Sequence, residues 1–122
     1  MDGTDMKGFE DLNVWLKSKQ LAVEIYRAFQ NNLDYTFKNQ ICRASLSIPS
    51  NIAEGYERNT PKEFIRFLNI AKGSCGEIRT QLYIAKDLEY LNPQIADEFL
   101  TETRSIAAML SGLIKTTSNK MV

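Results

Sequence analysis

The sequence predicts an all-α fold, an antiparallel up-down-up-down bundle of four helices, and three observations lead to it. Apolar residues recur three and four positions apart along most of the 122-residue chain, which is the spacing of one helix face. No segment alternates apolar and polar residues with the period of a strand, and no Asn-Gly or Asp-Gly hairpin signal is present. Two of the three prolines directly follow a residue that can cap a helix.

The expected helices are joined by connections of only a few residues, so helices adjacent in sequence should pack antiparallel. A polar leader precedes the bundle, and a polar tail that frays follows it. The expected segments are a disordered leader over 1–8, a four-helix bundle over 9–117 with helices at about 10–30, 35–55, 61–90 and 93–117, and a tail over 118–122.

The first expected helix carries apolar residues on two sides. A four-helix bundle buries one stripe per helix, so the additional stripe is either the edge of a broad core face or a surface for self-association. We favour self-association. The core stripe is expected to contain Leu12, Trp15, Leu16, Val23 and Tyr26. The oligomer interface is expected at Val14, Leu21, Ile25 and Phe29, together with Cys42 and Leu46 of the next helix.

The second expected helix contains a segment that breaks helical rules. Pro49 has no amide to donate to the carbonyl of Ser45, and its ring crowds that carbonyl. A kink is therefore expected there, with serine hydroxyls serving the freed groups. Gly55 is expected to end the helix in a left-handed conformation. The core stripe of this helix is expected to be Phe37, Ile41, Ala44, Ile48 and Ile52.

Two polar residues of the same segment, Asn51 and Glu54, flank the apolar stripe. The structural motif formed with Pro49 and Gly55 has two interpretations. One is a polar network between helices, reaching Arg43, Ser74 or Glu77 across the bundle. The other is a site for a ligand or nucleic acid.

The third expected helix begins at Thr60-Pro61, where the threonine can cap the amide of Glu63. Lys72, Arg79 and Lys86 recur every seven residues along it and lie within about 40° of one another. They form a narrow basic line. The core stripe of this helix is expected to be Phe64, Phe67, Ala71, Cys75, Ile78, Leu82 and Ala85.

The fourth expected helix begins at Asn92-Pro93, which repeats the same logic of a cap followed by a proline. Its apolar residues fall on a single side, as a core face requires. The core stripe is expected to be Ile95, Phe99, Ile106, Leu110 and Leu113.

Composition excludes several classes of chemistry. The chain has no histidine, which removes Ser-His-Asp and Cys-His nucleophiles, histidine bases and almost every catalytic zinc site. Glu54 and Glu77 are the interior-leaning carboxylates, and hydrogen-bonded structural acids are the simpler interpretation. We therefore expect no enzyme, no metal and no cofactor.

The two cysteines and the absence of a long apolar run bear on location. Cys42 and Cys75 have no second cysteine at ligand spacing, which is typical of reduced, buried thiols in a cytoplasmic protein. No segment approaches the roughly 18 apolar residues of a membrane span. A cytoplasmic location without membrane contact is expected.

Several segments carry a family resemblance. They are FEDL at 9–12, QICRA at 40–44, SIPSNIAEG at 47–55, EFIRFL at 63–68 and AKGS at 71–74. Together they resemble the bacterial four-helix-bundle family whose genes were first noticed in intervening sequences of 23S ribosomal RNA genes. The resemblance implies a homopentamer in a ring or barrel. A related branch, the accessory protein of diversity-generating retroelements, implies contact with nucleic acid and a reverse transcriptase.

Two functions stay open. The first is a non-catalytic oligomer that binds structured RNA or DNA, because phosphate binding scales with the number of cations that an assembly gathers. The second is a protein-interaction adaptor with no nucleic-acid role, which the balance of 15 basic and 15 acidic residues favours. The residues expected to contact nucleic acid are Arg43, Lys72, Arg79 and Lys86; a solvated flank with acidic neighbours is the alternative interpretation.

Overall fold

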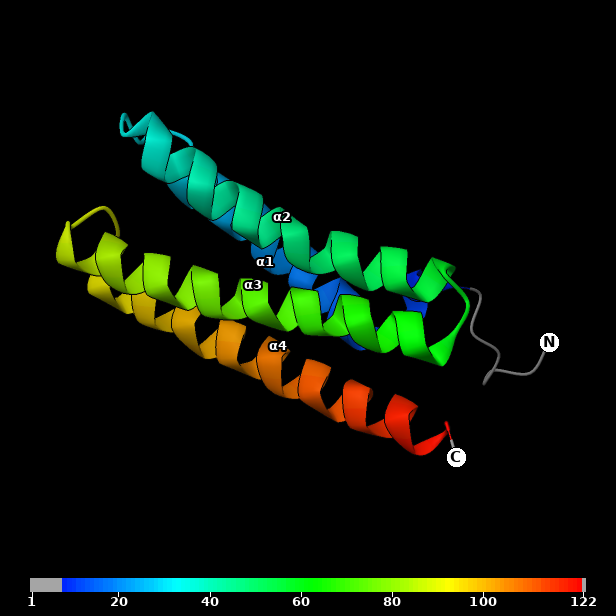
Figure 1. Cartoon of the computed structure of the whole chain (residues 1–122). Coiled ribbons are helices and arrows are strands. Elements are labelled where there is room, and N and C mark those ends of the chain that lie inside the picture. Colours follow the sequence, from blue (N-terminus) through cyan, green and yellow to red (C-terminus); the bar gives the residue numbers. More distant parts are fainter. Residues whose placement is uncertain (1–7, 122) are drawn as a thin grey trace.

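The computed structural model describes residues 8–121, within which it contains four α-helices and no strand (Figure 1). A short 3₁₀ turn, η1 (Phe9–Asp11), precedes the helices. They are α1 (Asn13–Phe29), α2 (Tyr35–Glu57), α3 (Pro61–Asp87) and α4 (Pro93–Asn119). The predicted all-α helical bundle is confirmed. The leader expected over 1–8 falls outside the described residues except for Gly8, which is buried.

The N-termini of α3 and α4, each with a cap residue followed by a proline, form as expected. The Thr60 hydroxyl accepts a hydrogen bond from the Glu63 amide at 3.2 Å, and the Asn92 side chain accepts one from the Gln94 amide at 2.8 Å. Each cap satisfies an amide that has no partner within its helix. Proline at the next position costs nothing, because its missing amide would have had no partner there.

Four helix boundaries differ by two or more residues from the expected ones. α1 starts later than expected, because Leu12 is extended and turns the chain so that Phe9 contacts the edge of Trp15. α2 runs through Gly55 instead of ending there, and the left-handed residue is Asn59. α3 ends earlier, at Asp87; the left-handed Glu89 follows two residues later, and the Tyr90 amide donates to the Ala85 carbonyl. α4 extends to Asn119, so residues 118 and 119 of the expected tail are helical.

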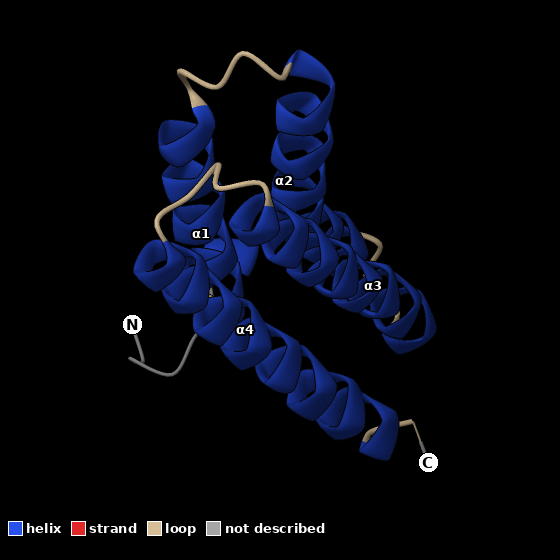
Figure 2. Ribbon diagram, turned by 90° about the vertical axis from the view of Figure 1, so that its left-hand side faces the viewer, coloured by secondary structure: helices blue, strands red, loops and turns tan. Residues whose placement is uncertain are grey.

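The backbone of each helix runs close to those of the two helices beside it, α1 next to α2 and α4, and α3 next to α2 and α4. The core runs along the bundle axis between all four helices. Toward its C-terminal end α4 leans away from α1, as the two views together show (Figures 1 and 2). The predicted core of α2 and α3 is confirmed, whereas Ile95 of α4 is exposed.

A hydrogen bond joins the two interhelical turns at one end of the bundle. The Tyr90 hydroxyl donates to the Asp34 carboxylate at 2.7 Å, and Asp34 also caps α2 by accepting from the Phe37 amide. These two contacts, the hydroxyl first, lower the pKa of Asp34 below its ordinary value. Tyr90 also packs its ring edge against Phe37. The α1–α2 and α3–α4 turns are therefore held together.

Gly55 has a packing role rather than the predicted left-handed one. A Cβ built on Gly55 would lie 2.6 Å from the Cβ of Phe67 on α3, closer than two such carbons can approach. Glycine therefore sets how closely α2 and α3 pack at this level. The side chain that uses the space, Phe67, is buried and has the guanidinium groups of Arg58 and Arg66 over its ring.

Replacing Gly55 by alanine should destabilise the fold by about 1–3 kcal/mol, because the two helices must separate to admit the methyl group. Gly73 and Gly112 are matched controls, since a Cβ built on either meets nothing within 4 Å. Alanine there should instead stabilise by roughly 0.5–1 kcal/mol through helix propensity. Chemical denaturation of the three variants measures the difference. Equal behaviour at the three positions would contradict the packing role.

Tyr90→Phe should lower the melting temperature at neutral pH and should lose that effect in acid. The Asp34 carboxylate has a depressed pKa in the folded state, so its contribution is present above the ordinary value near 3.8 and is lost as the pH falls through the folded value. Melting curves between pH 2 and 7 test this. Tyr35→Phe is the control, because no hydrogen bond of the Tyr35 hydroxyl occurs among the described residues. A pH-independent difference would contradict the account.

Candidate functional site

Burial of the two apolar stripes of α1 differs from that predicted, although Leu12 and Trp15 of the predicted core stripe do pack against the core. The stripe predicted as an interface is buried within the single chain; its members are Val14, Leu21, Ile25 and Phe29. Cys42 of α2, also predicted at the interface, is buried with them, and only Leu46 of that set is exposed. The interface prediction is therefore wrong for five of its six residues.

The side of α1 that is buried is linked to aromatic packing at the end of the bundle that carries the α1–α2 and α3–α4 turns. Phe29 packs against Phe37 with ring centroids 5.9 Å apart, and Phe37 packs against Tyr90 at 5.4 Å. This run of aromatic rings links α1, α2 and the α3–α4 turn, and it rotates the Phe29 side of α1 into the core. Three members of the other stripe then face outward: Leu16, Val23 and Tyr26 are 43%, 37% and 45% exposed.

The outward stripe meets α2 in an apolar groove, which we call the α1–α2 groove. It encloses about 350 Å³. Leu46, half exposed, and Pro49 contribute from α2. Its lining residues are Lys19, Ala22, Val23, Tyr26, Arg27, Leu46 and Pro49. Almost all of the lining surface is apolar, although Lys19 and Arg27 contribute to it, and the Lys19 ammonium lies over the Trp15 ring. Such a surface is unusual where it faces water.

The Ser47–Asn51 segment makes the polar contact between helices that one interpretation predicted. The Ser47 and Ser74 hydroxyls lie 2.7 Å apart across α2 and α3. The Asn51 side-chain amide donates to the Ser47 carbonyl at 2.8 Å. Arg43 and Glu77 take no part in it, and α2 continues through Pro49. The segment thus has hydrogen-bonded structural roles.

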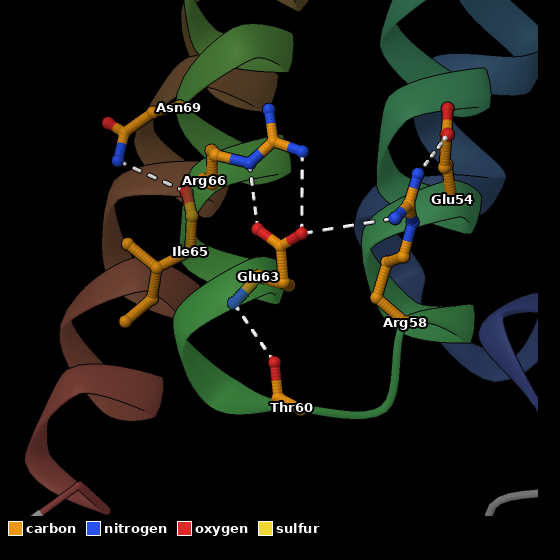
Figure 3. A network of polar contacts seen from close by, with 7 residues as sticks. All are labelled: Glu54, Arg58, Thr60, Glu63, Ile65, Arg66 and Asn69. Atoms are coloured by element: carbon orange, nitrogen blue, oxygen red, sulfur yellow. Dashed lines mark hydrogen bonds and ion pairs between the residues drawn. The ribbon is translucent and has the colours of Figure 1, made fainter.

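Glu54 belongs to a different network, at the α2–α3 turn (Figure 3). It accepts from Arg58 at 3.2 Å, Arg58 lies 3.9 Å from Glu63, and Glu63 accepts from Arg66 at 2.7 Å. The hydrogen bond from Arg66 is the main reason that the pKa of Glu63 is lowered. Two arginines face two glutamates here, so the network offers little net charge to an anion.

The predicted basic line is only partly free. Lys86 forms an ion pair with Asp97 of α4 at 2.8 Å, and this contact raises the pKa of Lys86. Lys72 is exposed and Arg79 is half-buried, and neither takes part in an ion pair of residues 8–121. Within the predicted line, the cations free of an ion pair among residues 8–121 are thus Lys72 and Arg79.

Arg43 does not join this line. Ser74, which contacts α2, lies roughly 120–160° around α3 from Lys72, Arg79 and Lys86, so those three face the α4 side. Arg43 instead lines a separate hollow of about 240 Å³ on α2 with Thr36, Asn39 and Gln40. The structure therefore does not bring the four predicted nucleic-acid contacts together within one chain.

The thiols and carboxylates offer little chemistry within the described part of the chain. Burial raises the pKa of the Cys75 thiol to about 11 and also raises that of Cys42, so neither forms the thiolate that nucleophilic attack needs. No group of three cysteine, aspartate or glutamate side chains among residues 8–121 could hold a metal ion. None of the described helices is long and apolar enough to cross a membrane.

Sequence reasoning missed the groove and the Tyr90–Asp34 contact. Leu16, Val23 and Tyr26 form one stripe, which was predicted to lie in the core. The signal against that placement is Lys19, a charged residue in the middle of this stripe, whereas the opposite stripe has the uncharged Ser18 and Ala22 between its apolar members. Tyr90 and Asp34 are 56 positions apart, and nothing in the spacing of either pairs them.

Comparison with known proteins adds a family and a fold. Residues 10–112 match the model of the family described as 23S rRNA-intervening sequence protein. A crystal structure of a protein of unknown function from the S23 ribosomal protein family of Bacteroides thetaiotaomicron is similar, with a TM-score of 0.78 and 26% identity. The similarity covers 84% of this chain and 95% of that one. The search of curated proteins gave no match.

Proposed function

Because the chain belongs to the 23S rRNA-intervening sequence protein family, we propose that it is a non-catalytic assembly protein. Several copies of an antiparallel up-down-up-down bundle associate through the α1–α2 groove, and the assembly binds nucleic acid. The stoichiometry we propose is five, which the family resemblance implies. Two unpaired, buried cysteines suit a reducing cytoplasm as the place where it acts.

The observation that carries the proposal is the apolar surface that α1 and α2 leave exposed. Leu16, Tyr26 and Leu46 are each nearly half exposed while their neighbour Ile25 is fully buried. Covering such side chains with a second protein surface removes apolar area from water, at about 25 cal/mol per Å². Association is the usual reason for a soluble bundle to keep them outside.

The nucleic-acid part of the proposal depends on assembly. In a single chain the basic line offers Lys72 and Arg79 as cations without an ion pair among the described residues, too few for useful affinity. Five copies would gather about ten, and the affinity for phosphate grows with the number engaged. The solved relative is assigned by its name to a ribosomal protein family, which favours RNA as the first ligand to test.

The alternative is an adaptor whose groove takes a partner other than its own copy. The zero net charge of the chain favours it, because no bulk field draws the protein to a polyanion. Partner binding that is insensitive to salt, with no RNA binding at low salt, would select the adaptor over the nucleic-acid assembly.

The groove is tested by the double variant Val23→Asp with Leu46→Asp. Two carboxylates inside an apolar contact must be desolvated on association, so the mass measured by light scattering should fall toward the 13.9 kDa of one chain. Leu33→Asp is the matched control, since Leu33 is 79% exposed and does not line the groove. If both proteins keep the mass of the wild type, the groove is not the interface.

The basic line is tested with Lys72→Gln combined with Arg79→Gln. A structured RNA should bind the wild type at low salt, and the double variant should bind it at least tenfold more weakly, with a shallower salt dependence. Lys86→Gln is the control, because that ammonium already pairs with Asp97, and its effect should be small. Filter binding between 50 and 300 mM salt measures all three. An unchanged salt slope in the double variant would contradict the assignment.

A further inference from the structure

Tyr83 presents a partly open aromatic ring at the boundary between α3 and α4. The residue is 47% exposed, and within the described chain no other aromatic ring or cation packs on its ring. The guanidinium of Arg104 on α4 donates a hydrogen bond of 2.6 Å to the Tyr83 hydroxyl oxygen. This contact holds the ring between the two helices. A ring that is held in place and open to solvent is available for stacking.

Two lysines lie at equal distances from this contact. Lys72 precedes Tyr83 by eleven residues, and Lys115 follows Arg104 by eleven. Each lysine is therefore roughly 16 Å along its helix from that contact and within about 20° of it around the helix surface. The neighbouring ion pair of Lys86 with Asp97 shows that the two spacings extend the same way along the bundle, where α3 and α4 run side by side (Figure 1).

The surface between these residues is cationic and has small side chains. The guanidinium of Arg79 lies near Gly76, since a Cβ built on that glycine would be 4.0 Å from the Arg79 Nη2 atom. None of the four cations takes part in an ion pair of the described residues. We call this surface the α3–α4 seam, and its residues are Lys72, Gly76, Arg79 and Tyr83 of α3 with Arg104, Ala108, Ser111 and Lys115 of α4.

The carboxylates nearest to the seam lie beyond one end of it. They fall between the Tyr83–Arg104 contact and the α3–α4 turn, and they are Asp87, Asp97, Glu98 and Glu102. Glu77 lies between Lys72 and Arg79 in sequence, but it is roughly 140–160° around α3 from both. A polyanion is therefore favoured on the seam when it extends from Tyr83 toward the two lysines, away from the acidic end.

From this arrangement we infer that the α3–α4 seam binds single-stranded nucleic acid, with an unpaired base stacked on Tyr83 and phosphates held by the four cations. Neighbouring base pairs cover both faces of a base inside a duplex, whereas an unpaired base offers a face to an aromatic side chain. This inference rests on the nucleic-acid binding proposed above. It names the form of nucleic acid that is bound and the residue that selects that form.

The seam stays open when copies associate as proposed. α1 lies next to α2 and α4, and α3 lies next to α2 and α4, so the α3–α4 side of the bundle is opposite the α1–α2 side. None of the seam residues lines the α1–α2 groove. Each copy in an assembly therefore keeps its own seam, and a long single strand can engage several of them at once.

A stacking role for Tyr83 is tested with a short labelled oligouridine, measured by fluorescence anisotropy. Tyr83→Leu should weaken binding about 5- to 100-fold, because the leucine offers no ring to a base. Tyr83→Phe keeps the ring and should stay within about twofold of the wild type. Tyr35→Leu is the control, since Tyr35 is 62% exposed on α2 and lies outside the seam. Circular dichroism and light scattering confirm that each variant keeps its fold and mass.

Salt dependence separates stacking from charge. Tyr83→Leu should leave the slope of log affinity against log salt unchanged, whereas Lys115→Gln should make it shallower by about 0.7, the value for one phosphate contact on a single strand. Arg43→Gln should have no such effect, because Arg43 lies on α2 outside the seam. With the wild type, an oligonucleotide of abasic sites should bind as weakly as oligouridine binds Tyr83→Leu, since it keeps the phosphates and lacks the bases.

The outcomes separate this inference from the function on which it rests. A wild type that binds neither oligouridine nor a structured RNA would overturn both. RNA binding that depends on Lys72 and Arg79 but is unchanged in Tyr83→Leu would leave the proposed function standing and overturn the stacking site. Equal affinity for oligouridine and for its duplex with oligoadenine would do the same. So would full affinity of the wild type for the abasic strand.

Discussion

A helix with apolar residues on two sides can bury only one of them inside its own bundle, and α1 is such a helix. The packing of Phe29 on Phe37, and of Phe37 on Tyr90, decides which side goes inward. Leu21 and Ile25 follow Phe29 into the core, and Val23 and Tyr26 are left outside. The exposed groove is thus a direct consequence of how the core closes at the turn end. The proposed assembly depends on which side of α1 faces the core.

The charges of the chain divide in a similar way into satisfied and unsatisfied sets. Arg58 and Arg66 face Glu54 and Glu63 at the α2–α3 turn, and Lys86 faces Asp97 between α3 and α4. Exposed pairs of this kind add little stability, but they remove their members from any role in binding a partner. Charged side chains without an ion pair among the described residues, such as Arg27 at the groove and Lys72 and Arg79 on α3, are available to a second molecule. Although the net charge is zero, some charged side chains are paired within the chain and others are not.

Sequence periodicity was enough to predict the four helices and the core faces of α2 and α3. Those helices have one apolar stripe that dominates, so the inward side follows from the pattern. α1 has two apolar stripes, and the tertiary contacts of Phe29 accompany burial of the stripe that contains no charged residue. The basic line on α3 was visible as a seven-residue repeat, but the neutralisation of Lys86 by Asp97 arises between helices. Gly55 looked like a helix stop because its other use, the close approach of Phe67, leaves no mark on the sequence.

The family match and the solved relative agree with an all-α bundle and leave the activity open. The central claim is that one chain leaves an apolar groove that another copy covers. The most direct test is the mass of the wild-type protein in solution, measured by light scattering over a hundredfold range of concentration. The account expects a discrete multiple of 13.9 kDa at the upper concentrations. A mass of one chain throughout the range would contradict it.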